Sequence, residues 1–177
     1  MKASANRPQK PPERLGTFRA QIRESPEMND HKPRLFECDA DIRRIGEGLL
    51  ACTLPKADWT HEAHLAACTW IVRNRPDIVP ERDMPMIISR YNESVGGVNS
   101  DTEGYHETIT QVFIAAVREH LGEVDRSVPL VEAVNALLLS ERGRRDWPLR
   151  FYSRERLFSV EARREFLVPD TSAFDLE

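Results

Sequence analysis

Apolar residues recur at intervals of three and four along five stretches of this chain, and each stretch ends at glycine or proline residues. This spacing places the apolar side chains on one face of a helix, because a helix turns by about 100° per residue. No stretch alternates apolar with polar residues for long enough to indicate a strand. The pattern therefore predicts an all-α fold, a bundle of about five helices around a shared core.

The ends of these helices follow from capping residues and helix breakers. Pro85 suits the first turn of the third helix, where a missing N–H costs nothing. Ser100 and Glu103 have the S-x-x-E spacing of a capping box, which marks the start of the fourth helix. We expect the first helix to span residues 39–52 and the second to run to 73 from a cap at Asp58 or Thr60. The third follows Asp83 and ends before Gly96, the fourth follows the capping box and ends near 121, and the fifth spans 127–142.

One helical domain is expected over residues 36–170. Residues 1–35 hold five of the twelve prolines and many charges, so we interpret them as a disordered tail, with residues 171–177 as a second tail. An alternative is that Met28 is the natural start. The last part of the domain reads as irregular, with one or two short helical turns for which Ser153 and Ser159 are the candidate caps.

Composition limits the class of protein. The 177 residues are 40% hydrophobic, which is enough for one core, and the net charge of -4 argues against a nucleic-acid partner. Three cysteines without a C-x-x-C pair indicate a reducing compartment. The sequence has neither an apolar run of about 20 residues nor a signal-peptide core. We therefore expect a cytoplasmic protein outside the membrane, with a small-molecule ligand or substrate. The sequence does not define its oligomeric state.

Three histidines are the candidate metal ligands. His61 and His64 lie three residues apart on the second helix, whose apolar residues cover both sides, so both side chains are expected to point inward. His106 is expected on the apolar face of the fourth helix. Imidazole is a common ligand for zinc, iron and copper, and three histidines with one open position would suit a catalytic ion. Cys68 lies on the same face as His64 and is a conceivable thiolate ligand.

The leading hypothesis is a metal-dependent, hydrolase-like enzyme for a small substrate. Glu107 would act as base or orienter, and His106 would be both a ligand and a catalytic group. Glu62 is disfavoured because it points about 100° away from His61. The expected substrate pocket comprises Trp59, Asn99, Asp101 and Tyr105.

Other interpretations of the histidines stay open. The same ligands would suit an iron or copper reaction with oxygen, and a metal-free acid/base site is another variant. A rival class is a non-catalytic module that binds a small ligand or a protein, in which each imidazole is hydrogen-bonded to a neighbour within the core. Distances between the ring nitrogens would separate these classes, because metal–nitrogen bonds are about 2 Å long.

Residues 141–164 form a second candidate site. They hold eight arginines against four acidic residues, with Trp147, Phe151 and Tyr152 interleaved. Guanidinium groups suit bidentate contacts to phosphate or carboxylate. We interpret Arg150, Arg154 and Arg156 as a possible anion patch. The alternative is that the arginines clamp the C-terminal segment onto the helices through carboxylate pairs.

Three short motifs give the chain a resemblance. WTHEAHL stands at 59–65, GYHET at 104–108 and YSRERLFSVEARR at 152–164. Together they resemble a group of small bacterial proteins with W-T-H-x-x-H-L, then G-Y-H-E-T, over about residues 35–170. The resemblance implies a bacterial origin and a single signature that joins the two histidine segments, but no activity. The chain does not resemble the HD-type phosphohydrolases, because their His-Asp doublet is missing.

Overall fold

The computed structural model of the chain describes residues 32–171, so most of the two expected tails lies outside the described residues. Within this range the chain forms helices and turns and no strand, which confirms the all-α prediction. No helix in the described range is long and apolar enough to cross a membrane.

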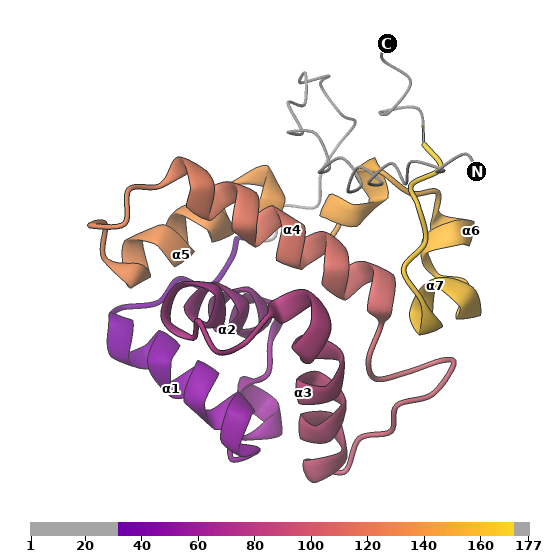
Figure 1. The fold of residues 1–177 in the computed structure, drawn as a ribbon, viewed down its shortest axis with the longest axis horizontal. Coiled ribbons are helices and arrows are strands. Elements are labelled where there is room, and N and C mark those ends of the chain that lie inside the picture. The colour runs from indigo at the N-terminus through magenta and orange to yellow at the C-terminus, as the bar shows by residue number, and fades with distance from the viewer. Residues whose placement is uncertain (1–31, 172–177) are drawn as a thin grey trace, which may run out of the picture. The chain divides into compact units, whose positions relative to one another are not determined.

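Five longer helices and two short ones make up the described fold (Figure 1). Their bounds are α1 Asp39–Ala51, α2 His61–Asn74, α3 Pro80–Ser94, α4 Glu107–Glu123, α5 Leu130–Leu139, α6 Arg154–Leu157 and α7 Val160–Arg164. Three 3-10 turns join them: η1 Lys56–Asp58, η2 Glu141–Gly143 and η3 Trp147–Arg150.

Helix α2 is at the centre of the core. Its residues from Leu65 to Ile71 are all buried, as expected for a helix that is apolar on both sides. Helix α2 packs closely on α1, since a Cβ on Gly46 of α1 would collide with the ring of Trp70 of α2. Thr60 caps α2 by accepting from the N–H of Ala63 at 3.3 Å, which confirms one of its two predicted starts.

Helix α3 starts earlier than expected, so the prediction of Pro85 in a first turn is wrong. The helix begins at Pro80, and the Asp83 carboxylate accepts from the N–H of Val79 at 2.8 Å. Pro85 therefore lies inside the helix, where its missing N–H leaves the carbonyl of Glu81 without a helical donor. Gln111 of α4 fills that place, since its Nε2 donates to the Glu81 carbonyl at 2.9 Å.

Helix α4 starts later than expected. Ser100 and Glu103 close a turn instead, with Ser100 N–H donating to the Glu103 carbonyl at 3.0 Å and Glu103 N–H donating to Ser100 Oγ at 3.3 Å. The helix begins at Glu107, and His106 is its N-cap. Helix α5 is also shorter than expected, with its first turn bound by Asp39 of α1, whose Oδ1 accepts from Val131 N–H at 2.7 Å.

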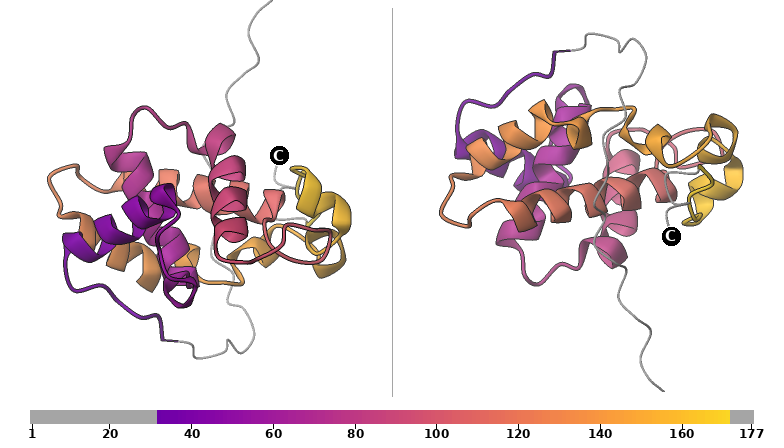
Figure 2. Two further views of the ribbon diagram at one scale, coloured as in Figure 1. Left: turned by 90° about the horizontal axis from the view of Figure 1, so that it is seen from below. Right: turned by 90° about the horizontal axis from the view of Figure 1, so that it is seen from above.

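The C-terminal part of the domain holds the two short helical turns expected from the sequence. Ser153 caps α6 and Ser159 caps α7 through their hydroxyl groups. Figure 1 shows both helices beside the N-terminal end of α4, and α4 packs against α7. The loop between α3 and α4 extends to α7 in both views of Figure 2. Arg164 of α7 pairs with Asp101 of this loop at 2.7 Å.

Candidate functional site

The structure does not bring the three candidate histidines together as a metal centre. Among residues 32–171, no group of three or more histidine, cysteine, aspartate or glutamate side chains is close enough to hold an ion. His61 and His64 share α2, whereas His106 lies at the start of α4. Each of the three rings bonds instead to a backbone carbonyl.

His106 is the most constrained of the three. Its ring is buried, and its Nδ1 accepts from the N–H of Ile109 at 3.3 Å, which caps α4. Its Nε2 lies 2.9 Å from the carbonyl of Leu157 in α6. A carbonyl only accepts, so Nε2 carries the hydrogen. Burial, with the Arg163 guanidinium nearby, lowers the pKa of His106, which keeps the ring neutral and both nitrogens in use.

His61 bonds in the same way to a distant part of the chain. Its Nε2 lies 2.8 Å from the carbonyl of Gly143 in η2, so this nitrogen is also a donor. Its ring stands edge-on to Phe113 of α4, with centroids 5.3 Å apart. His120, to which the sequence assigned no chemistry, makes an equivalent bond from Nε2 to the carbonyl of Ala133 at 2.9 Å.

His64 differs, because its bond leaves the other ring nitrogen as an acceptor. Its Nδ1 donates to the carbonyl of Thr60 at 2.6 Å, within the first turn of α2. The ring packs on Trp59 with centroids 3.8 Å apart. Burial lowers the pKa of His64 to about 4, although the Thr60 carbonyl favours the charged form. The ring is therefore neutral at pH 7, with its lone pair on Nε2.

These donors do not fit a shared metal ion. A metal takes the unprotonated nitrogen of a neutral imidazole, whereas Nε2 of both His61 and His106 carries a hydrogen, and Nδ1 of His106 holds the helix cap. Cys68 is buried, and burial raises the pKa of its thiol to about 12, so it stays protonated. A thiol in that state is a poor ligand.

Glu107 has both carboxylate oxygens in use. Oε2 accepts from the hydroxyl of Tyr105 at 2.6 Å, and Oε1 accepts from Nε2 of Gln111 at 2.8 Å. Burial and the Glu107 carboxylate raise the pKa of Tyr105. The pair Tyr105–Glu107 is therefore a hydrogen-bonded unit at the start of α4, and a catalytic role for Glu107 stays a prediction.

The other expected pocket residues make structural contacts. Asn99 ties the loop to α3, since its Nδ2 donates to the carbonyl of Ser89 and its Oδ1 accepts from Tyr105 N–H, at 3.0 and 3.1 Å. Asp101 forms a bidentate ion pair with Arg164. Trp59 packs between His64 and Tyr91.

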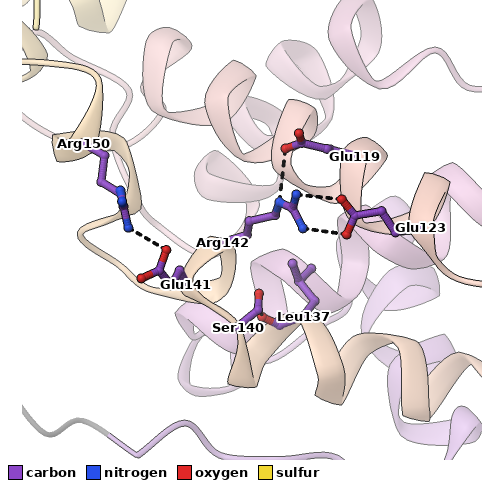
Figure 3. Close-up of polar contacts among 7 residues, drawn as sticks. All are labelled: Glu119, Glu123, Leu137, Ser140, Glu141, Arg142 and Arg150. Carbon is purple, nitrogen blue, oxygen red and sulfur yellow. Dashed lines mark hydrogen bonds and ion pairs between the residues drawn. The ribbon is translucent and has the colours of Figure 1, made fainter. Parts of the chain in front are cut away.

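Several arginines of residues 141–164 pair with carboxylates of the chain, and Arg142 does so in the way expected of a clamp. Figure 3 shows Arg142 reaching from η2 to α4, where it donates to Glu119 at 3.1 Å and twice to Glu123 at 2.9 Å. Arg150 pairs with Glu141 at 2.6 Å. Each of these contacts is internal to residues 119–150, and each places a guanidinium on a carboxylate.

The remaining arginines of the predicted anion patch also make internal contacts. Arg156 Nε donates to the carbonyl of Val168 at 2.9 Å, and the Arg154 guanidinium lies over the ring of Phe158 at 5.6 Å. These internal contacts therefore support the clamp better than they support a set of arginines available to an external anion. An anion-binding role for Arg150, Arg154 and Arg156 stays a prediction.

Sequence reasoning missed Thr108, which fastens the C-terminal segment to α4. Its side chain is fully buried, and its hydroxyl donates to the Glu165 carbonyl at 2.8 Å and accepts from Leu167 N–H at 3.1 Å. Thr108 is the last residue of the GYHET motif, so the motif itself was the available signal. We call the set His61, His106, Thr108, Arg142 and Arg163 the C-terminal clamp, because each binds a segment distant in the sequence.

Two of the three sequence motifs meet in this clamp. His106 bonds to Leu157, and Arg163 donates to the carbonyls of Gly104 and Tyr105 at 3.3 and 3.0 Å. GYHET and the 152–164 segment are therefore in direct contact. Comparison with protein families, with curated proteins and with solved structures gives no match to this chain.

Proposed function

We propose that this chain is a non-catalytic helical module that binds a small ligand or a protein partner, and whose histidines are structural groups of the core. One observation carries the proposal: Nε2 of His61, His106 and His120 each donates to a backbone carbonyl of another part of the chain. A buried imidazole that is hydrogen-bonded in this way needs no metal to be satisfied.

Exposed apolar side chains support the binding part of the proposal. Four large ones lie within residues 158–168, and their exposed fractions are high: Phe158 56%, Val160 43%, Phe166 52% and Val168 66%. A contiguous apolar patch on a protein surface often marks a binding site, and we propose that these four side chains form one.

Metal analysis of the full chain tests the structural role of the histidines. The protein is incubated with Zn²⁺, Fe²⁺ or Cu²⁺ in turn and dialysed, and the bound metal is then measured in wild type, His61→Ala, His106→Ala and the control His120→Ala. We expect well under one ion per chain in all four. One ion per chain in wild type and in the control, lost in the other two variants, would overturn the proposal.

A second candidate is a metal-free acid/base enzyme at His64. The bond from Nδ1 to Thr60 fixes the tautomer and leaves Nε2 as a base, and the nearby Arg145 charge disfavours its protonation. Hydrolysis of p-nitrophenyl acetate by the full chain tests this candidate. Activity that disappears in His64→Gln but persists in His120→Gln would favour the enzyme over the binding module.

A further inference from the structure

A small pocket lies away from the histidines, where three helix ends meet. It is lined by residues from the start of α1, the end of α2 and the start of α5, and its volume is about 190 Å³. This is space for several water molecules or one small organic molecule. The lining residues that matter below are Asp39, Arg43, Trp70, Arg73 and Leu130.

Arg73 lines this pocket, and one nitrogen of its guanidinium has no hydrogen-bond partner in the described part of the chain. Its Nη2 donates to the carbonyls of Arg126 and Val128 in the loop before α5. Its Nη1 is buried and is the one buried side-chain nitrogen or oxygen among residues 32–171 that has no hydrogen-bond partner. A buried donor without an acceptor costs about 1–3 kcal/mol, and more when it is charged, so such a group calls for a partner.

The charges around the pocket favour an anion as that partner. Arg43 is exposed on α1 and lines the pocket beside Arg73. The one acidic residue of the described lining is Asp39, whose Oδ1 accepts from the N–H of Val131 at 2.7 Å, so two guanidinium groups face one carboxylate. The pocket also lies at the N-terminal ends of α1 and α5, where the helix dipoles favour negative charge, and at the C-terminal end of α2, whose dipole acts in the opposite direction.

The walls favour an organic anion over an inorganic one. Trp70 and Leu130 supply apolar surface, together with Val128 and Pro129. A planar carboxylate matches the planar guanidinium, and a short apolar body would lie against these walls. We propose that this site, the Arg73 pocket, binds a small organic carboxylate whose oxygen accepts from Arg73 Nη1.

Binding requires a small movement of one side chain. Nη1 is covered in the described structure, so the guanidinium must adjust for the ligand oxygen to reach it. Side-chain adjustments of this size are common when proteins bind ligands. The inference goes beyond the proposed function, since the pocket shares no residue with the clamp and would stand even if His64 were catalytic.

Titration of the ¹⁵N-labelled full chain with propionate at constant ionic strength tests the Arg73 pocket. Propionamide is the neutral control, and inorganic phosphate is the control for an inorganic anion. The amide signals of residues 128–131 are followed. We expect saturable shifts with propionate, with a Kd of the order of millimolar for so small a ligand, and no saturation with propionamide. Absence of saturation with propionate, or equal shifts with propionamide or with phosphate, would overturn the proposal.

Two variants separate the pocket from general charge effects. Arg43→Gln should weaken propionate binding about two- to fivefold, as expected for one exposed charge. The matched control is Arg75→Gln, which removes a charge one residue beyond α2 that pairs with Asp77 and does not line the pocket. Neither change touches the carbonyls that Arg73 holds. Equal binding by wild type and Arg43→Gln, or an equal loss in both variants, would contradict the assignment.

Discussion

A histidine whose Nε2 donates to a backbone carbonyl holds that segment of the chain in place. A histidine with an unprotonated Nε2 is available as a base. His106 belongs to the first kind and His64 to the second. Both are neutral at pH 7, because burial lowers the pKa of each ring. The distinction depends on the partner of each nitrogen and not on the spacing of the residues.

Substitution of His106 separates its two structural roles. His106→Ala removes the cap of α4 and the bond to Leu157, so we expect a loss of about 2–4 kcal/mol in the free energy of unfolding. His106→Asn keeps a good N-cap residue and loses only the bond to Leu157, so it should recover about 1 kcal/mol of that loss. Urea denaturation of both variants measures the difference. Equal losses would show that His106 does not act as a cap.

Acid should weaken the fold through His64. Its pKa is about 4 in the folded chain and 6.5 in the reference state. Between these values the unfolded chain binds a proton that the folded chain does not, so the free energy of unfolding falls as pH falls from about 6.5 to about 4, by up to about 3 kcal/mol. The lowered pKa of His106 acts with the same sign.

The variant His64→Gln isolates this contribution. Its free energy of unfolding should fall less steeply over the same pH range, whereas His120→Gln is the control that keeps His64. Urea denaturation at pH 7, 6, 5 and 4.5 measures the slopes. A slope in His64→Gln equal to that of wild type would show that His64 is not the titrating group.

At the scale of elements, the C-terminal segment is held to α4 by polar bonds as well as by apolar packing. Its own core is small, with Tyr152, Leu157, Ala162 and Leu167 as the buried residues. Thr108 supplies two of its bonds, and Arg142 bridges η2 to α4. We therefore expect this segment to be sensitive to the loss of single hydrogen bonds.

Two matched threonine substitutions test that expectation. Thr108→Val removes the bonds to Glu165 and Leu167 from a fully buried site, and we expect a cost of about 2 kcal/mol with faster amide hydrogen exchange at Leu167. Thr69→Val is the control, since Thr69 is equally buried but bonds only to Leu65 in its own helix. Exchange at Leu167 that is unchanged in Thr108→Val, or equally raised in both, would contradict the clamp.

At the scale of the whole molecule, the sequence predicted the class of fold and several helix ends. Thr60, Ser153 and Ser159 cap helices where the sequence placed caps, because a short polar side chain before an apolar repeat is a local signal. The S-x-x-E spacing at residue 100 misled for the same reason, since those two residues also suit a tight turn. The start of α3 was missed because Asp83 caps it from inside the helix.

The site could be predicted only in part. The motifs contain part of the C-terminal clamp, because His106 and Thr108 lie in one motif and Arg163 in another, although reasoning from the sequence gave Thr108 no role. It could not give their roles, since the bonds from His61 to Gly143 and from His106 to Leu157 join residues 82 and 51 positions apart. Helix periodicity places a ring on a face, but the partner of each nitrogen depends on how the helices pack.

Nuclear magnetic resonance of the histidine rings in the ¹⁵N-labelled full chain at pH 7 tests the central claim most directly, because long-range ring couplings report which nitrogen carries the hydrogen. The structure predicts a protonated Nε2 in His61, His106 and His120, and a protonated Nδ1 with a bare Nε2 in His64. One equivalent of Zn²⁺ should leave these signals of His61 and His106 in place. A bare Nε2 in both, or their joint shift on addition of Zn²⁺, would contradict the structural role and favour a metal centre.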